Sequence, residues 1–505
     1  MPVRQVRDVQ ATAVVAIGGG WCDGRAWVFL YVVTIDHQVV DLGHRDETGV
    51  KQLTIEPTSA KPEDGGPSLR RSLSFINLFI FGLVCMAPVA AFTMYGFVSV
   101  TSDGATILSY LLGAAGILLT ALSFAQMAAV AAQSGSVYGY AKFAVGWRVG
   151  FLGGWAMLLD YLLLGALTAV YGALYIANGL PQVPEWAFLG AVFTLLLSSG
   201  IKGVSLSSKF DFMVLLAQLA FSVLFVILAS LMIYQAVDVA PAFDLFPDAS
   251  STYAVLGGAS LTVISFLGFD AISTLAEEVS GQRPGRDIGL ATVLSVIIML
   301  IIFIVVSWLL DRLAIGLVLP DPAIAAFDIL AQRMPALATP LALICGLAIG
   351  IGGTQACHTG STRLVFAMAR DRQLPAVLGR INRVTRTPIS AALLTFAIIA
   401  TISTVALDQA ELLANLVSFG ALSGFFLVNF SVINHFGIRQ RSRSWIRHWL
   451  APLLGMAVIA YIMTGINPLA LKVGLGWMAL GLVIHWLHNR GDELEPRETV
   501  DENPV

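Results

Sequence analysis

Charged side chains are scarce in this chain: Asp, Glu, Lys and Arg together make up 12% of its 505 residues. Soluble domains carry about twice that share, so a water-exposed surface over the whole chain is excluded. Cysteine is scarce too, and the four that occur lie too far apart for a disulfide framework or a zinc motif. The seven histidines form no cluster, and no nucleophile–base pair is visible. We therefore expect no enzyme, no metal, no cofactor and no nucleic-acid partner.

Hydrophobic residues, in contrast, make up 57% of the chain, and the mean hydropathy is +0.80. Apolar runs of about 20 residues, each long enough to cross a lipid bilayer, recur from residue 75 onward. The pattern predicts an all-α polytopic membrane protein with twelve transmembrane helices. The predicted spans are 75–99, 105–132, 148–178, 185–200, 210–235, 253–278, 289–312, 336–368, 388–406, 411–436, 448–465 and 468–488.

The sequence divides into three regions: a tail over 1–70, a transporter domain over 71–488 and a short C-terminal tail over 489–505. The first region has broken apolar content and then a polar stretch, so we expect it to be disordered. Val50 precedes that polar stretch, and a bacterial valine codon can start translation. We therefore expect the true start near Val50, with residues 1–49 dispensable.

Orientation follows from the basic residues that flank the spans, because positive charge collects on the cytoplasmic side. With the N-terminus inside, the cytoplasmic segments hold 19 Lys and Arg, whereas the opposite loops hold three: Arg312, Arg333 and Lys472. The sequence thus predicts a bacterial inner-membrane protein with both termini in the cytoplasm.

The sixth predicted span is interrupted. Gly268 breaks its helical pattern, and Asp270 follows at membrane depth. A charge there is costly unless it is paired or hydrated, and irregular backbone is tolerated only where protein or a water-filled cavity surrounds it. Asp270 is therefore a candidate site residue, although a structural glycine kink with a buried, partnered Asp270 would give the same pattern.

The first span is interrupted as well. Pro88 removes a backbone donor, and Gly82 adds freedom six residues earlier. Broken helices at corresponding positions of two halves are the best sequence indication of a transporter site between inverted repeats. We expect the two breaks to form the substrate site, with Met86, Ala87 and Pro88 from the first span and Phe266, Gly268, Phe269 and Asp270 from the sixth.

Several motifs resemble those of the amino acid–polyamine–organocation superfamily, and in part its putrescine-importer branch. They are Gly268-Phe-Asp-Ala-Ile-Ser-Thr-Leu-Ala-Glu-Glu-Val279, Ser361-Thr-Arg-Leu-Val-Phe-Ala-Met-Ala-Arg-Asp-Arg-Gln-Leu-Pro375, Gly135-Ser-Val-Tyr-Gly-Tyr140 and Leu159-Asp-Tyr-Leu162. The resemblance covers roughly residues 72–488. It implies a five-plus-five inverted-repeat core with discontinuous first and sixth helices, two added helices, and proton-driven uptake.

The chain departs from this family in the first span. Amino acid permeases of the superfamily usually carry Gly-x-Gly there, where bare amides hold the substrate carboxylate. This chain has Cys85-Met-Ala-Pro88 instead, which favours a substrate without a carboxylate, such as a diamine. The branch also usually continues past Asp160-Tyr161 into a proline and an asparagine, which are missing here.

Acidic and aromatic residues near the breaks are candidates to bind an amine or carry the coupling proton. Asp270, Glu277 and Asp160 are candidates for both roles, with helix capping or backbone bonding as the structural alternative. Tyr138 is a candidate for cation–π contact or a membrane-interface residue. Lys209 could replace a coupling cation or anchor the inner end of its span.

Three functions remain open. The first is an importer of putrescine or a related polyamine, driven by proton symport with alternating access. The second is an amino acid permease or an amine/amino-acid exchanger. The third, of another class, is an amine-sensing transceptor, for which the tails of about 70 and 17 residues leave little room.

Overall fold

The computed structural model describes the helical region from residue 74 to residue 492 and four short segments before it. Described are 19–22, 25–28, 32–35, 38–41, 74–131, 136–202, 208–235, 251–275, 279–280, 284–382, 385 and 387–492. The chain forms two compact units, Met1–Leu69 and Arg70–Val505.

The described part of the first unit consists of two antiparallel hairpins. β1 (Gly19–Cys22) pairs with β2 (Arg25–Val28), and β3 (Val32–Ile35) pairs with β4 (Gln38–Asp41). These strands differ from the disorder that we predict from the composition of residues 1–70. The missed signals are Asp23-Gly24, a dipeptide that favours tight hairpins, and the β-branched run from Val32 to Ile35.

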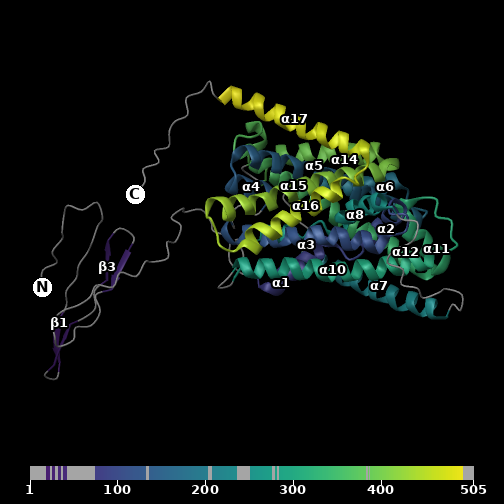
Figure 1. Ribbon diagram of the computed structural model, residues 1–505, viewed down its shortest axis with the longest axis horizontal. Coiled ribbons are helices and arrows are strands. Elements are labelled where there is room, and N and C mark those ends of the chain that lie inside the picture. The colour runs from purple at the N-terminus through teal and green to yellow at the C-terminus, as the bar shows by residue number, and fades with distance from the viewer. Residues whose placement is uncertain are drawn as a thin grey trace. The chain divides into compact units, whose positions relative to one another are not determined.

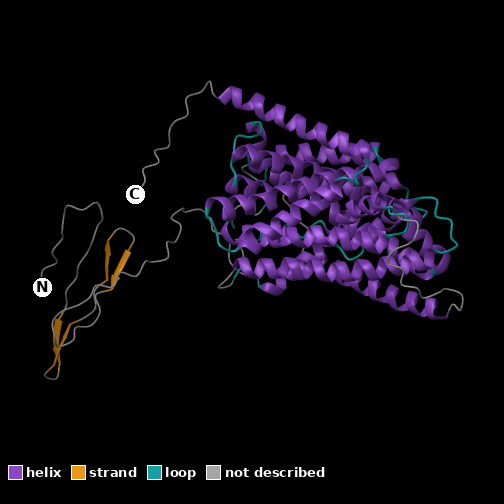
Figure 2. Cartoon of the chain, viewed as in Figure 1, coloured by secondary structure: helices purple, strands orange, loops and turns teal. Residues whose placement is uncertain are grey.

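All described secondary-structure elements of the second unit are helices (Figures 1 and 2). This unit is an all-α polytopic membrane domain. Its α-helices are α1 (Phe75–Met86), α2 (Ala90–Thr101), α3 (Thr106–Val130), α4 (Val137–Ala144), α5 (Trp147–Gly179), α6 (Glu185–Lys202), α7 (Ser208–Gln235), α8 (Thr252–Phe266), α9 (Ala271–Thr274), α10 (Pro284–Ala314), α11 (Ala325–Arg333), α12 (Pro335–Cys345), α13 (Thr354–Arg370), α14 (Ile389–Val405), α15 (Ala410–Val432), α16 (Ala451–Met463) and α17 (Pro468–Asp492). Short 3-10 or π-helical turns are η3 (Pro322–Ile324), η4 (Gly346–Gly353), η5 (Ala376–Gly379), η6 (Leu407–Gln409), η7 (Ile433–Arg439) and η8 (Ile446–Leu450).

Among the described residues, nine helices are long and apolar enough to cross a membrane, and α1 with α2 makes a tenth if the bent pair is one span. Two shorter apolar helices, Glu185–Ile201 and Ile389–Val405, occupy the remaining predicted ranges. The two shorter helices would cross a bilayer only if the bilayer thins locally or the flanking side chains reach its surface. The count of twelve spans, which includes them, therefore stays a prediction, and so does the inverted repeat.

The first span is bent by 47° between α1 and α2. Pro88 lies in the bend, and Ala87 has a left-handed φ of 49°, which is uncommon for a residue with a side chain. Gly82 plays a different part from the one expected. It lies inside α1, where an added Cβ would come within 2.5 Å of Ile272 Cδ1 and 2.8 Å of Ser295 Oγ. Gly82 therefore allows α1 to pack closely against α9 and α10.

The sixth span is interrupted between α8 and α9 by residues 267–270. Gly268 has a φ of +109°, a conformation that L side chains rarely adopt, so the break requires glycine at this position. The Ser251 side chain caps the start of α8 by accepting a hydrogen bond from the Ala254 N–H. The break predicted from Gly268 is thus present.

α5 is a long helix that is buried over most of its length, and it carries Asp160 and Tyr161. Its Gly172 lies against Gly350 of η4, where an added Cβ would be 2.5 Å from the Gly350 Cα. Gly420 of α15 also lies against α5. An added Cβ on Gly420 would be 2.8 Å from the backbone N of Asp160. Small residues thus let the helices surround α5 closely.

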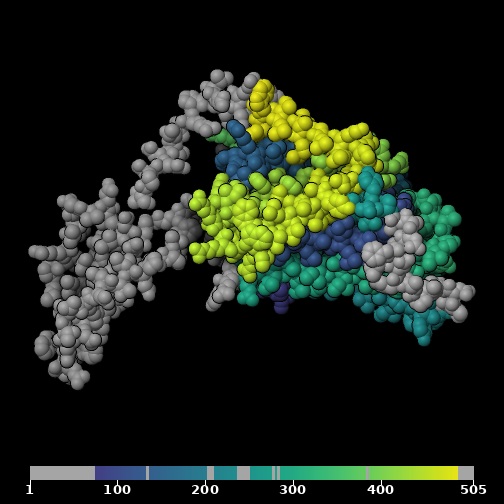
Figure 3. Space-filling view, viewed as in Figure 1, coloured from purple at the N-terminus to yellow at the C-terminus, as the bar shows by residue number. Residues whose placement is uncertain are grey.

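α17 joins α5 through a symmetric pair of tryptophans. Trp155 Nε1 donates to the Trp477 carbonyl at 2.8 Å, and Trp477 Nε1 donates to the Trp155 carbonyl at 2.9 Å. The two rings stack with centroids 4.5 Å apart. α16 and α17 form much of the face seen in Figure 3.

Candidate functional site

The two helix breaks touch each other. An added Cβ on Gly268 would lie 2.6 Å from the Cys85 carbonyl oxygen and 2.7 Å from its carbonyl carbon. Residue 85 belongs to the last turn of α1, directly before the bend at Ala87. The breaks at 87–89 and 267–270 are therefore adjacent in space, as expected from their corresponding positions in the sequence.

Asp270 ends the second break and is held by a phenol. The Tyr161 hydroxyl donates a hydrogen bond to Asp270 Oδ2 at 3.0 Å. The Ser273 hydroxyl donates to the backbone carbonyl of Asp270 at 2.6 Å, which fixes the turn into α9. Asp270 is 7% exposed. A carboxylate this deep is a strong acceptor for an ammonium group.

Asp160 precedes Tyr161 on α5 and is 1% exposed. Its Oδ1 atom is buried without a hydrogen-bond partner among the described residues. Asp160 and Asp270 lie within range of mutual electrostatic influence. Within the described part of the chain they are the two buried acidic residues, and no Lys or Arg is buried. The site therefore favours a cation or a bound proton.

Aromatic side chains surround the second break on two sides. Phe269 packs against Phe124 and Phe425, with ring centroids 5.4 and 5.1 Å apart. Phe266 packs against Phe303 at 5.1 Å and against Tyr110 at 6.3 Å. Both phenylalanines of the break are fully buried. These packed rings hold the interrupted backbone in place without supplying hydrogen bonds.

The first break offers no free amide hydrogen. The Ala87 N–H donates to the Leu83 carbonyl at 3.2 Å, and the Ala90 N–H donates to the Ala87 carbonyl at 2.8 Å. Pro88 has none, and the Val89 N–H points to Gln218 Oε1 at 3.5 Å. Met86, Ala87 and Pro88 are buried. They therefore shape the site sterically rather than by hydrogen bonds.

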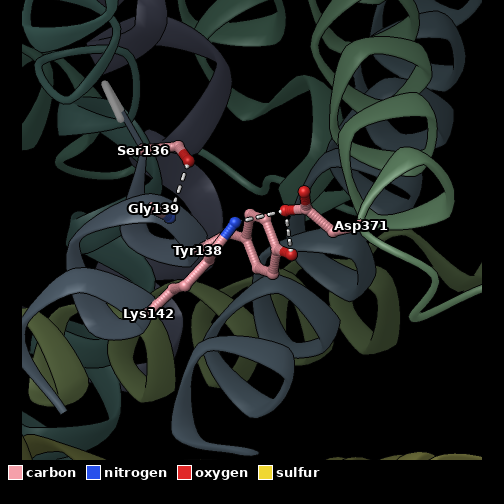
Figure 4. Close-up of polar contacts among 5 residues, drawn as sticks. All are labelled: Ser136, Tyr138, Gly139, Lys142 and Asp371. Carbon is pink, nitrogen blue, oxygen red and sulfur yellow. Dashed lines mark hydrogen bonds and ion pairs between the residues drawn. The ribbon is translucent and has the colours of Figure 1, made fainter. Parts of the chain in front are cut away.

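Tyr138 forms a polar cluster with Lys142 and Asp371 (Figure 4). Its hydroxyl donates to Asp371 Oδ2 at 2.6 Å, and Lys142 Nζ binds the same oxygen at 2.7 Å. Lys142 also lies 3.8 Å above the Trp147 ring. Burial, followed by the bond to Asp371, raises the pKa of Tyr138, so this phenol stays neutral and donates. Tyr138 thus ties α4 to the residue that follows α13.

The side chains of two other candidates, Glu277 and Lys209, lie outside the described part of the chain. Glu277 lies outside the described residues, and of Lys209 the structure describes the backbone in α7 but not the side chain. Three residues that the sequence motifs did not indicate also contact the breaks: Gln218, Phe124 and Phe425. Gln218 had a usable signal, since an amide in the middle of an apolar span is costly unless it bonds another helix.

No group of three or more His, Cys, Asp or Glu that could hold a metal ion occurs in the described part of the chain. Two adjacent helix breaks inside a bundle of apolar helices, beside buried carboxylates, are instead the architecture of a membrane transporter.

Comparison with known proteins places the chain in a family. The family model for amino acid permeases matches residues 77–483, so the chain belongs to the amino acid permease family. It is a transporter and not an enzyme.

Its relatives differ in what they carry. The chain is 26% identical over 435 residues to the low-affinity putrescine importer PlaP of Escherichia coli K12, with 84% of this chain and 94% of PlaP covered. It is 27% identical to the methylthioribose transporter of Bacillus subtilis 168 over 88% of this chain and 98% of that protein. It is also 27% identical to the branched-chain amino acid permease BcaP of the same strain, over 84% and 94% of the two chains.

A solved structure shares the fold. The manganese transporter of Eremococcus coleocola, crystallised with an aromatic bis-isothiourea compound, superimposes with a TM-score of 0.51 at 13% identity. The match covers 84% of this chain and 97% of that one.

Proposed function

We propose that the protein imports putrescine or a related polyamine by proton symport with alternating access, as a twelve-span transporter of the bacterial inner membrane with both termini in the cytoplasm. The observation that carries this proposal is the chemistry of the paired breaks. The buried Asp270 lies at one break, the buried Asp160 precedes the Tyr161 that binds Asp270, and the other break has no free N–H group.

The first break argues against a substrate carboxylate. An anion at a helix break is normally held by unpaired backbone N–H groups. Here each amide hydrogen from residue 87 to residue 90 already has an acceptor, and Pro88 has no amide hydrogen. A zwitterionic amino acid would leave its carboxylate without donors at this place, at a cost of several kcal/mol.

The second break supports a substrate with positive charge. Asp270 and Asp160 are buried without a buried Lys or Arg among the described residues. A diamine has an ammonium group for each carboxylate, so substrate binding would neutralise both. One of the two can then carry the coupling proton in the unloaded state. Inward movement of a dication also gains about 2.3 kcal/mol per charge for each 100 mV of membrane potential.

An amino acid permease or an exchanger is the second candidate. The similarity to BcaP favours it. Membership of the family is compatible with either substrate class, so only transport of a defined substrate distinguishes them.

The test is uptake into proteoliposomes that contain the full chain. Labelled putrescine, arginine, glutamate and leucine are compared with and without an inward proton gradient. We expect gradient-dependent putrescine uptake that glutamate and leucine do not compete with. Asp160→Asn should weaken it, whereas the exposed Asp408→Asn is a matched control and should leave it unchanged. Leucine uptake without putrescine uptake would refute the proposal.

A further inference from the structure

The segment between α15 and α16 concentrates positive charge without acidic neighbours in sequence. Arg439, Arg441, Arg443 and Arg447 lie within nine residues, and all four are exposed. The nearest acidic residues along the chain are Glu411 and Asp492. Among the described residues, no ion pair to an acidic side chain involves these arginines. Their charge is therefore available to an external anion.

This segment is an ordered structure. The Ser442 N–H donates to the Phe436 carbonyl at 2.9 Å, and the Ser442 hydroxyl lies 2.7 Å from His448 Nδ1. The rings of Phe436 and His448 stack with centroids 4.5 Å apart. These contacts bring the two ends of the segment together, so its arginines are presented from a fixed scaffold. A signal that only sets membrane orientation requires no such order.

Apolar side chains beside the arginines indicate the kind of partner. Trp445 is 62% exposed, Ile446 69% and Ile438 53%. Tryptophan with aliphatic side chains next to clustered arginines is typical of the headgroup region of a membrane. The yellow-green part of the chain, which includes this segment, reaches the surface of the helical unit in Figure 3.

We infer that residues 438–447 form a binding site for the headgroup of an anionic phospholipid in the adjacent membrane leaflet. The arginines bind the headgroup phosphate, and Trp445 and Ile446 insert at the level of the glycerol and upper acyl chain. The competing occupant is the chain's own acidic C-terminus, since residues 492–505 hold six Asp and Glu and one Arg. An acidic peptide leaves the exposed Trp445 and Ile446 unexplained, whereas a phospholipid accounts for them.

The experiment is native mass spectrometry of the full chain, purified in a neutral detergent and offered equal amounts of phosphatidylglycerol and phosphatidylcholine. Wild-type protein should retain phosphatidylglycerol preferentially. The triple variant Arg441→Gln, Arg443→Gln, Arg447→Gln should lose that preference by roughly 100-fold, about fivefold for each arginine. The variant Arg441→Lys, Arg443→Lys, Arg447→Lys keeps the positive charge and should retain most of the preference for phosphatidylglycerol.

The control is Arg148→Gln, Arg286→Gln, Arg370→Gln, which removes the same charge from exposed arginines on three separate helices, α5, α10 and α13, and should keep the preference. All variants must elute as a single folded species in size-exclusion chromatography. Equal retention of the two lipids by wild type, or equal losses in both Gln triples, would overturn the inference. A preference that emerges only after deletion of 493–505 would assign the arginines to the acidic tail instead. Because the readout is lipid retention, the result does not depend on which substrate is carried.

Discussion

Gly268 lies against the backbone of Cys85, and this contact joins the two helix breaks into one site. An added Cβ at position 268 would lie 2.6 Å from the Cys85 carbonyl oxygen, and the residue already has a φ of +109°. Only glycine fits at this position, because any side chain would be strained by the backbone conformation and would collide with Cys85.

Gly268→Ala should therefore destabilise the protein and abolish uptake. The backbone conformation alone costs about 1–3 kcal/mol for a non-glycine residue, and the collision with Cys85 adds to it. Gly190→Ala is the control, because an added Cβ on Gly190 meets nothing within 4 Å. The measurement is thermal unfolding in detergent together with transport. Similar melting temperatures for the two variants would show that the breaks are not in close contact.

Asp270→Asn should leave a folded protein that does not transport. Asparagine keeps the size of the side chain and can still accept from Tyr161, but it has no charge for an ammonium group or a proton. A lost charge-assisted hydrogen bond of about 3 kcal/mol reduces binding by roughly 100-fold. Uptake is measured from about pH 5.5 to 8. Transport near the wild-type rate over that range would make Asp270 a structural residue.

Gln218→Leu should slow transport and lower stability, because it leaves the Val89 N–H without its acceptor at membrane depth. A buried unsatisfied amide costs about 1–3 kcal/mol. Ser222→Ala, one turn later on α7, removes a bond to the Gln218 carbonyl in the same helix and should have a small effect. If both variants unfold at the wild-type temperature, Gln218 does not support the first break.

Asp371→Asn should weaken the attachment of α4, since Asp371 accepts from both Tyr138 and Lys142. Its side chain is 20% exposed and that of Lys142 is 29% exposed, so solvent screening limits the ion pair to about 1 kcal/mol. A double-mutant cycle with Tyr138→Phe and Asp371→Asn measures the contribution of the hydrogen bond between the Tyr138 hydroxyl and Asp371. Additive effects on unfolding would mean that the two side chains act independently in solution.

The predicted topology is tested by reporter fusions after Leu245 and Leu378. Twelve spans with an internal N-terminus place the first outside the cell and the second inside. A cytoplasmic reporter at both sites would contradict the assignment of the spans between them.

The sequence was sufficient for features that depend on local composition. Apolar runs located the helices, because a span must hold about 20 residues that need no water. Gly268 and Pro88 located the breaks, since their backbone constraints act within their own helix. The acidic residues at positions 160 and 270 were identified for a related reason, because a carboxylate in an apolar run is exceptional wherever it points.

Tertiary structure decided everything that joins distant segments. The Tyr161 bond to Asp270 spans 109 residues and the Gln218 contact with Val89 spans 129. Gly82 was expected to loosen its helix and instead allows close packing against Ile272. Tyr138 binds Asp371, which lies 233 residues away in the sequence, and its motif did not predict this contact. Such contacts depend on how helices of similar composition pack against one another, and apolar runs alone do not specify which faces meet.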